Sequence, residues 1–424
     1  MSNKTIGNIF KGDKVIWMVF FFLCMISIIE VYSASSSLSY KSGNFMAPVI
    51  RHILILIGGV FTMICMLKVK CKYFKIVTPF MLVFSWLMLI WVLFAGHSTN
   101  GASRWINFVG IQFQPSELAK GTLVLAVAQI LSAMQGKNGA EKKAFNYILG
   151  LSFFMTFPIM LENMSTAILL GITILCMMII GRVPGRLIGR LLGCIAMVVI
   201  ILVAAIFIFG KDEKEITKND NYTEQVATAQ PQEKGVWGKM FHRVDTWKAR
   251  IEHFFDTKEV APEDVDLDKD AQVAHANIAI ASSNVVGRGP GNSVERDFLS
   301  QAFSDFIYAI IIEEMGIGGG FFVALLYIIL LFRAGRIANR CENNFPAFLA
   351  MGLAILLVSQ ALFNMAVAVG LAPVTGQPLP LISRGGTSSI INCLYVGIIL
   401  SISRTAKKKD APRNEENNEK LALA

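Results

Sequence analysis

Long apolar runs alternate along this chain with short polar junctions. About ten of the runs approach the ~20 residues that an α-helix needs to cross a bilayer. Lysine and arginine cluster at every second junction, and the positive-inside rule assigns such junctions to the cytoplasm. The pattern predicts an all-α polytopic membrane protein with about ten transmembrane helices and both termini cytoplasmic. The expected helices cover residues 15–34, 50–67, 75–95, 115–134, 145–161, 164–181, 188–210, 305–332, 345–370 and 386–402.

The other junctions are rich in glycine, proline and charged residues, and we expect them to face outward because they alternate with the basic ones. The longest separates the first seven helices from the last three. The expected organisation is a cytoplasmic tail at 1–14, seven helices in 15–210, a large extracytoplasmic loop at 211–304, three helices in 305–402 and a cytoplasmic tail at 403–424.

The large loop contains a segment with helical periodicity. In residues 236–255, apolar side chains recur at helical spacing with lysine, histidine and arginine between them. This pattern is typical of an amphipathic helix at the membrane interface, although a helix that covers the bundle fits it equally well. Residues 271–284 predict a second short helix. The glycine-rich turn at 287–292 follows no strand, which argues against a nucleotide-binding loop.

Composition and charge narrow the possible functions. Hydrophobic residues make up 54% of the chain, and the net charge is +9. The cations flank apolar helices instead of forming one soluble face, so topology explains them and no nucleic-acid partner is predicted. All seven cysteines fall in expected spans or cytoplasmic loops, which leaves none for an extracytoplasmic disulfide. No sequence motif with metal-ligand spacing is present.

Ionisable residues near the outer ends of the helices are candidates for function, because a charge in the bilayer is costly without a partner or a role. Pro115 suits the first turn of a helix. Glu117 and Lys120 then lie three residues apart, where they can pair. One interpretation is a buried structural salt bridge. The other is a polar cavity in which Lys120 meets an anion.

Two arginines are also candidates for binding an anion. Arg104 lies beside the interfacial Trp105, and Arg384 lies between Ser383 and two glycines at the start of the last helix. A guanidinium group suits bidentate recognition of phosphate, and a helix start adds backbone donors. Snorkelling of the arginines to lipid headgroups is the competing explanation.

Asp305 follows Ser304 at the expected start of the eighth helix. A Ser-Asp pair in this position is typical of helix capping. A carboxylate on the rim of a basic, partly dehydrated cleft is also suited to act as a general base. Glu313 and Glu314 lie two turns deeper on different faces, and we expect them to hold helices together. An outward-facing site has no nucleotide donor, so the residues themselves indicate a protein that handles an anionic, membrane-delivered lipid.

The motifs resemble those of the SEDS family (shape, elongation, division and sporulation), membrane glycosyltransferases that polymerise lipid II into glycan strands. The chain is most similar to the cell-division branch, although elongation members share most of the motifs. The matching segments run in family order through nearly all the expected spans. They are residues 32–35, 100–106, 114–120, 287–293, 304–309, 313–316, 378–383 and 385–386.

This resemblance implies an inverting mechanism. Asp305 is expected to deprotonate the acceptor's 4-hydroxyl group for attack on the anomeric carbon, with undecaprenyl diphosphate leaving. The expected substrate-binding residues are Arg104, Glu117, Lys120, Ser383 and Arg384. The family implies a divalent cation, Mg²⁺ or Mn²⁺, although the sequence contains no evident ligand set. The expected partners are lipid II, the nascent glycan strand, a class B penicillin-binding protein and other divisome membrane proteins, in the inner membrane at the septum.

Two positions depart from the family pattern, and two other functions compete with the transferase. Asn163 stands where the family usually has aspartate, and Arg384 stands where it usually has tyrosine.

A lipid II flippase is the main alternative to the transferase, but transport requires polar groups through the thickness of the bilayer, and here the polar groups crowd the outer third. A non-catalytic scaffold would leave Asp305 replaceable.

Overall fold

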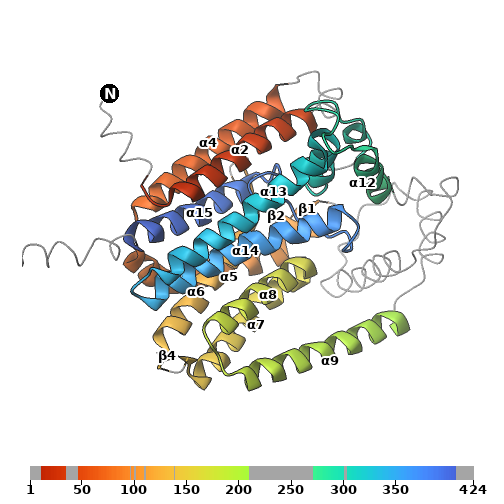
Figure 1. Cartoon of the computed structure of the whole chain (residues 1–424). Helices are drawn as coiled ribbons and strands as arrows, with labels where there is room; N and C mark the ends of the chain where they lie inside the picture. Colours follow the sequence, from red (N-terminus) through yellow and green to blue (C-terminus); the bar gives the residue numbers. More distant parts are fainter. Residues whose placement is uncertain are drawn as a thin grey trace, which may run out of the picture.

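The computed structural model describes residues 11–34, 46–95, 97–99, 102–108, 111–137, 139–209, 271–299 and 303–406. In these ranges it is a bundle of ten long helices, with successive helices running in opposite directions (Figure 1). Their bounds are α2 Lys14–Ala34, α4 Ala47–Lys68, α5 Cys71–Ala95, α6 Pro115–Ala133, α7 Lys142–Glu162, α8 Met164–Ile180, α9 Gly185–Phe209, α13 Ile307–Asn339, α14 Asn344–Ala368 and α15 Thr387–Ala406.

The described helices have the length and surface of membrane spans. Eight of them are long and apolar enough to cross a bilayer, while α8 is shorter, with 17 residues. Large apolar side chains cover their outward faces, as at Phe61, Phe80 and Phe94, which are 69%, 70% and 77% exposed. Such a surface is stable in lipid and not in water. The chain is therefore a multi-pass membrane protein, as the sequence predicted.

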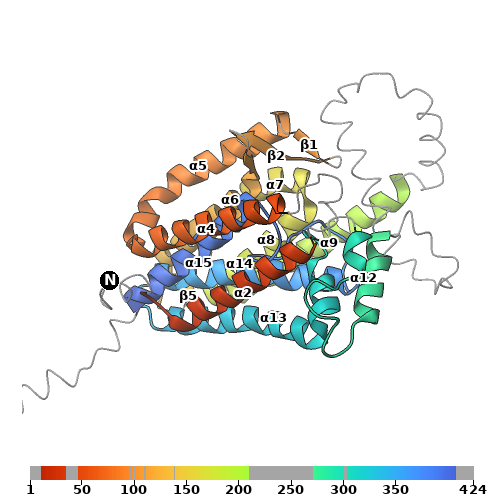
Figure 2. The same cartoon turned by 90° about the horizontal axis from the view of Figure 1, so that it is seen from above.

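The centre of the bundle is formed by α6, α14 and α15, in which about two thirds or more of each apolar span is buried. α14 packs against α6, α8 and α13, and α15 packs against α4. Figure 2 shows α5 and α13 on opposite sides of this centre. α9 lies at the margin of the bundle and contacts α8 (Figure 1).

The start of α2 and the end of α15 meet at one end of the bundle. The Asp13 amide donates to Ser403 Oγ (2.9 Å), and the Asp13 carboxylate pairs with Arg333 of α13. The clusters of basic residues lie at this same end, which we call the basic end. An even number of spans requires the two chain ends to share a face. That this face is cytoplasmic stays a prediction.

A small sheet occupies part of the segment 95–116, which the sequence led us to expect as a loop. Strands β1 His97–Thr99, β2 Ala102–Phe108 and β3 Ile111–Phe113 pair in the order β1-β2-β3, all antiparallel. At the opposite end of the bundle, β4 Gln135–Gly136 and β5 Gly139–Ala140 form a minimal hairpin. These strands have two to seven residues, too few to give a clear alternating pattern.

The large loop is described only in its last part. The amphipathic helix expected at 236–255 lies outside the described residues. The second short helix is confirmed as α12 Ala271–Ser282, and a 3₁₀ turn, η2 Glu295–Asp297, follows it. α13 begins at Ile307 and ends at Asn339, whereas the apolar run predicted residues 305–332.

Candidate functional site

α13 is broken at Gly316, where φ is 73° and ψ is 179°. The break frees backbone groups from the helical pattern, and the glycine-rich turn binds them. The amides of Arg288 and Gly289 donate to the main-chain oxygens of Glu313 (3.0 Å) and Glu314 (2.8 Å). A Cβ atom on Gly316 would lie 2.3 Å from the main-chain oxygen of Val285. Glycine is therefore required both for the conformation and for the close approach.

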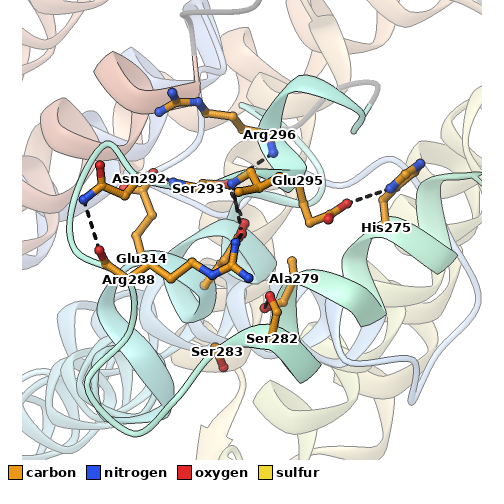
Figure 3. Close-up of polar contacts among 12 residues, drawn as sticks. His275, Ala279, Ser282, Ser283, Arg288, Asn292, Ser293, Glu295, Arg296 and Glu314 are labelled. Carbon is orange, nitrogen blue, oxygen red and sulfur yellow. Dashed lines mark hydrogen bonds and ion pairs between the residues drawn. The ribbon is translucent and has the colours of Figure 1, made fainter.

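Glu313 and Glu314 fasten the loop into this break (Figure 3). Both side chains are fully buried. Glu313 accepts from Arg288 (3.1 Å), from Ser293 Oγ (2.5 Å) and from the amide of Val294 (3.0 Å). Glu314 accepts from the amides of Gly291 (2.9 Å) and Ser293 (3.3 Å) and from the Ser33 hydroxyl. The two glutamates were expected to join helices. They mainly bind a loop instead, and Glu314 alone reaches another helix, through Ser33 of α2.

Further contacts hold the loop between α12 and α13. His275 Nδ1 lies 2.6 Å from Glu295 Oε2 (Figure 3), and the His275 ring stacks on that of Phe298. Arg296 donates to Ser33 Oγ (3.0 Å) and to the main-chain oxygen of Gly291 (2.6 Å). The glycine-rich turn is thus bound to α13 at Glu313 and Glu314 and to η2 through Arg296.

Asp305 lies in a turn at 303–305, just before α13. The N-cap residue of α13 is Phe306, whose side chain makes no capping hydrogen bond, so Asp305 lies one residue before the N-cap position. Ser304 Oγ donates to Asp305 Oδ1 (2.9 Å), and the Asn364 side chain donates to the Asp305 main-chain oxygen (2.8 Å). The turn is anchored through its backbone, while the Asp305 side chain stays partly exposed.

The segment before α15 binds the same turn. Ser383 Oγ donates to the main-chain oxygen of Ser304 (2.6 Å) and accepts from the amide of Leu379 (2.8 Å). The Arg384 amide donates to the main-chain oxygen of Phe303 (3.0 Å), and the guanidinium carbon lies 5.4 Å from the centre of the Phe303 ring. The structure therefore brings Ser383 and Arg384 together with the turn that carries Asp305.

The predicted pair of Glu117 and Lys120 is confirmed, with Nζ 2.8 Å from Oε1 and both side chains no more than 3% exposed. Lys120 also donates to Gln360 Oε1 (2.8 Å). Tyr395 donates to the main-chain oxygen of Glu117 (2.5 Å) and accepts from the amide of Gly121 (3.0 Å). Lys120 is thus enclosed and held by two side-chain oxygens, which is the geometry of a structural salt bridge.

Two amides of α14 connect these contacts, and sequence reasoning missed both. Gln360 donates to the main-chain oxygen of Pro378 (3.1 Å), and Asn364 donates to that of Gln377 (2.7 Å). The Gln377 side chain in turn donates to Thr166 Oγ1 (2.7 Å). The available signal was the spacing of two amide side chains, four residues apart in an otherwise apolar helix, which places them on one face.

The remaining predicted residues have simple placements. Asn163 caps α8 by accepting from the amides of Ser165 (3.1 Å) and Thr166 (3.4 Å). An aspartate would accept the same bonds, so this departure from the family pattern preserves the local structure. Arg104 lies on β2.

A preformed site for the expected divalent cation would need several metal-ligating side chains close together. In the described parts of the chain, no three His, Cys, Asp or Glu side chains gather as a metal ion would require. These residues do not form a ligand set for Mg²⁺ or Mn²⁺ by themselves.

Known proteins resemble this chain over nearly its whole length. A family model described as "Cell cycle protein" matches residues 13–408. The chain is 31% identical over 398 residues to "Probable peptidoglycan glycosyltransferase FtsW" of Geobacter sp. (strain M18), covering 92% of this chain and 96% of the relative. It is 28% identical over 397 residues to a protein of the same name from Coxiella burnetii (strain RSA 493 / Nine Mile phase I), covering 91% and 95%.

Solved structures resemble it in fold. The rod shape determining protein RodA of Thermus thermophilus superposes with a TM-score of 0.60 at 20% identity, covering 94% of this chain and 98% of that one. A chain from a structure described as "Structural coordination of polymerization and crosslinking by a peptidoglycan synthase complex" gives a TM-score of 0.67 at 21% identity, covering 93% and 98%.

Proposed function

The chain belongs to the family of cell cycle proteins that includes FtsW, RodA and SpoVE, and we propose that it is a peptidoglycan glycosyltransferase. It polymerises lipid II into glycan strands at the outer face of the cytoplasmic membrane, for septal synthesis during cell division. Relatives named as probable peptidoglycan glycosyltransferases, matched over more than nine tenths of the chain, support this function. The observation that carries the site assignment is the anchored turn at 303–305, which presents the partly exposed Asp305 beside Ser383 and Arg384.

In this proposal Asp305 is the general base. Its carboxylate accepts the proton of the acceptor's 4-hydroxyl group while the oxygen attacks the anomeric carbon of the donor. The bond from that carbon to the diphosphate breaks on the opposite face, so the configuration inverts and undecaprenyl diphosphate leaves. The bond from Ser304 orients the Asp305 carboxylate, and a positioned base of this kind accelerates proton transfer ~10²–10⁴-fold.

Charge on the leaving diphosphate must be stabilised as it develops. Arg384 is suited to this because a guanidinium group can bind phosphate oxygens in a bidentate manner. A Mg²⁺ or Mn²⁺ ion belongs to the proposal as a companion of the diphosphate. Mg²⁺ is commonly bound by one or two carboxylates together with substrate phosphates, so a preformed protein ligand set is not needed.

The proposed protein partner is a class B penicillin-binding protein, which crosslinks the glycan product. One structure of similar fold is described as a peptidoglycan synthase complex that coordinates polymerization and crosslinking, and this supports the pairing. Other divisome membrane proteins and a position at the division septum belong to the same proposal.

The test is polymerisation of purified lipid II by the full chain together with its penicillin-binding protein. We expect glycan strands from the native protein and none from Asp305→Asn. Asp297→Asn is the matched control, because Asp297 is an exposed carboxylate of the same loop region, 3.9 Å from Arg296, and this variant should polymerise normally. Failure of the native complex to make strands, with lipid II still transported, would support a flippase instead.

A further inference from the structure

Lys120, one of the cations expected to bind the anionic substrate, is buried. Lys120 is 1% exposed and already donates to Glu117 and Gln360. A ligand could reach its ammonium group only by breaking a buried ion pair, and leaving one partner of such a pair uncompensated is strongly destabilising. A diphosphate has two phosphate groups, and even with a divalent ion its oxygens can accept from more than one guanidinium group, so a second accessible cation beside Arg384 is expected.

Arg51 is the fifth residue of α4, in the part of that helix bound to the segment that carries Arg384. Ser27 Oγ donates to the main-chain oxygen of Ile382 (2.6 Å) and also bonds His52 Nε2 (2.8 Å). This chain of bonds fastens α2 and α4 to the segment that carries Arg384, two residues after Ile382, while Arg51 directly precedes His52. Partial burial and then the positive charge of Arg51 lower the pKa of Arg384 below its ordinary value. This effect agrees with the bonds of Ser27, which place Arg51 and Arg384 on neighbouring segments.

Among the described residues, no carboxylate compensates either arginine. In the described parts of the chain, Arg51 and Arg384 form no ion pair. Like charges held close together repel, and a guanidinium group carries its charge at neutral pH. The cluster thus has two positive charges with no carboxylate partner among the described residues, an arrangement that an anion would stabilise.

The position also suits a lipid. Arg51 is exposed, and the α4 side chains beside it, Ile50, Leu54 and Ile57, are 50%, 62% and 60% exposed. A long apolar chain can lie along this face while its charged headgroup reaches the arginines. On the other side, the bond from the Arg384 amide to Phe303 joins the cluster to the turn that carries Asp305.

We propose that Arg51 and Arg384 together form the clamp for the diphosphate of the lipid-linked donor, while Lys120 is a structural cation. This inference rests on the proposed function for the identity of the lipid. Arg51 binds one phosphate and Arg384 the other, each through two N–H donors. His52 stiffens the clamp through Ser27.

The test measures binding of undecaprenyl diphosphate to the full chain in phosphatidylcholine nanodiscs. We expect Arg51→Gln and Arg384→Gln each to weaken the affinity about tenfold or more, as loss of a charge-assisted hydrogen bond does. Arg51→Lys should recover part of the lost affinity, because lysine keeps the positive charge but lacks the two parallel N–H donors of the guanidinium group. Arg186→Gln, at an exposed arginine of the basic end, is the matched control and should bind as the native protein does.

Two results would overturn the clamp. One is native affinity in the folded double variant of Arg51 and Arg384. The other is equal competition by phosphatidylglycerol, which would indicate a general site for anionic headgroups. The proposed function fails separately. If the native complex makes no glycan strands while the Arg51 variants lose binding, the protein binds the lipid diphosphate but is not the transferase. If the Arg51 variants bind normally and Asp305→Asn is inactive, the transferase stands without the clamp.

Discussion

The two ends of the bundle differ in whether their charged side chains are exposed or buried. At the basic end, cations such as Arg186 and Arg336 are exposed and stand on helix ends where solvent and headgroups can reach them. At the other end, Glu117, Lys120 and Glu314 are buried. Lys120 is bound by Glu117 and Gln360, and Glu314 by the amides of Gly291 and Ser293. Burying charge is costly unless it is fully paired. The difference indicates that the basic end sets topology, whereas the Asp305 end is built to hold a fixed arrangement.

The largest effect on stability is expected at the buried ion pair of Glu117 and Lys120. Glu117→Gln leaves the Lys120 ammonium without its carboxylate in an enclosed site, and the expected loss of stability is ~3–5 kcal/mol. Glu141→Gln changes an exposed glutamate and should have little effect. Thermal unfolding of the purified variants in detergent measures both. Equal melting temperatures for the two variants would contradict the structural role of the pair.

A smaller effect is expected at the break in α13. Gly316→Ala introduces a Cβ atom at positive φ, 2.3 Å from the Val285 oxygen, and the expected cost is ~1–3 kcal/mol. Gly318→Ala, two residues later in the same helix, places its Cβ at an ordinary 3.4 Å from that oxygen and is the matched control. Limited proteolysis of the loop after α12 reports the result. Faster cleavage in the Gly316 variant alone is expected, and equal cleavage would mean that the loop is held elsewhere.

The smallest effect is expected at the basic end. Arg336→Gln removes an exposed cation from the last turn of α13, and such surface changes usually alter stability by no more than ~0.5 kcal/mol. Lipid II polymerisation by this variant should match that of the native chain. A large loss of activity with normal insertion would show that the basic end takes part in the reaction, and the contrast between the ends would fail.

The sequence predicted the spans well because apolar runs report burial in lipid directly. The helix ends were predicted less well. α13 continues past the predicted end at residue 332 to Asn339, because Arg333 is stabilised by Asp13 and the last basic turns remain helical. The Glu117–Lys120 pair was predictable from i, i+3 spacing alone. The convergence of Ser383 and Arg384 on the turn at 303–305 was not, because tertiary contacts from Gln360 and Asn364 set the path of that segment.

The position of Arg51 near Arg384 could not be predicted from the sequence either. In sequence it is one arginine at the start of an apolar helix, which topology and snorkelling explain. Its proximity to Arg384, more than 300 residues later, follows from the bonds of Ser27 to His52 and Ile382. Local patterns contain no record of such a contact.

The central claim is that Asp305 acts in the chemical step and not in binding. The most direct measurement is the single-turnover rate of glycosyl transfer at saturating lipid II, made beside the lipid II affinity of the same protein. Asp305→Asn should lower the rate by ~10²–10⁴-fold and leave the affinity within about twofold of native, because the turn at 303–305 is anchored through its backbone. A native rate in this variant, or a loss that arises from weakened binding alone, would contradict the assignment of Asp305 as the general base.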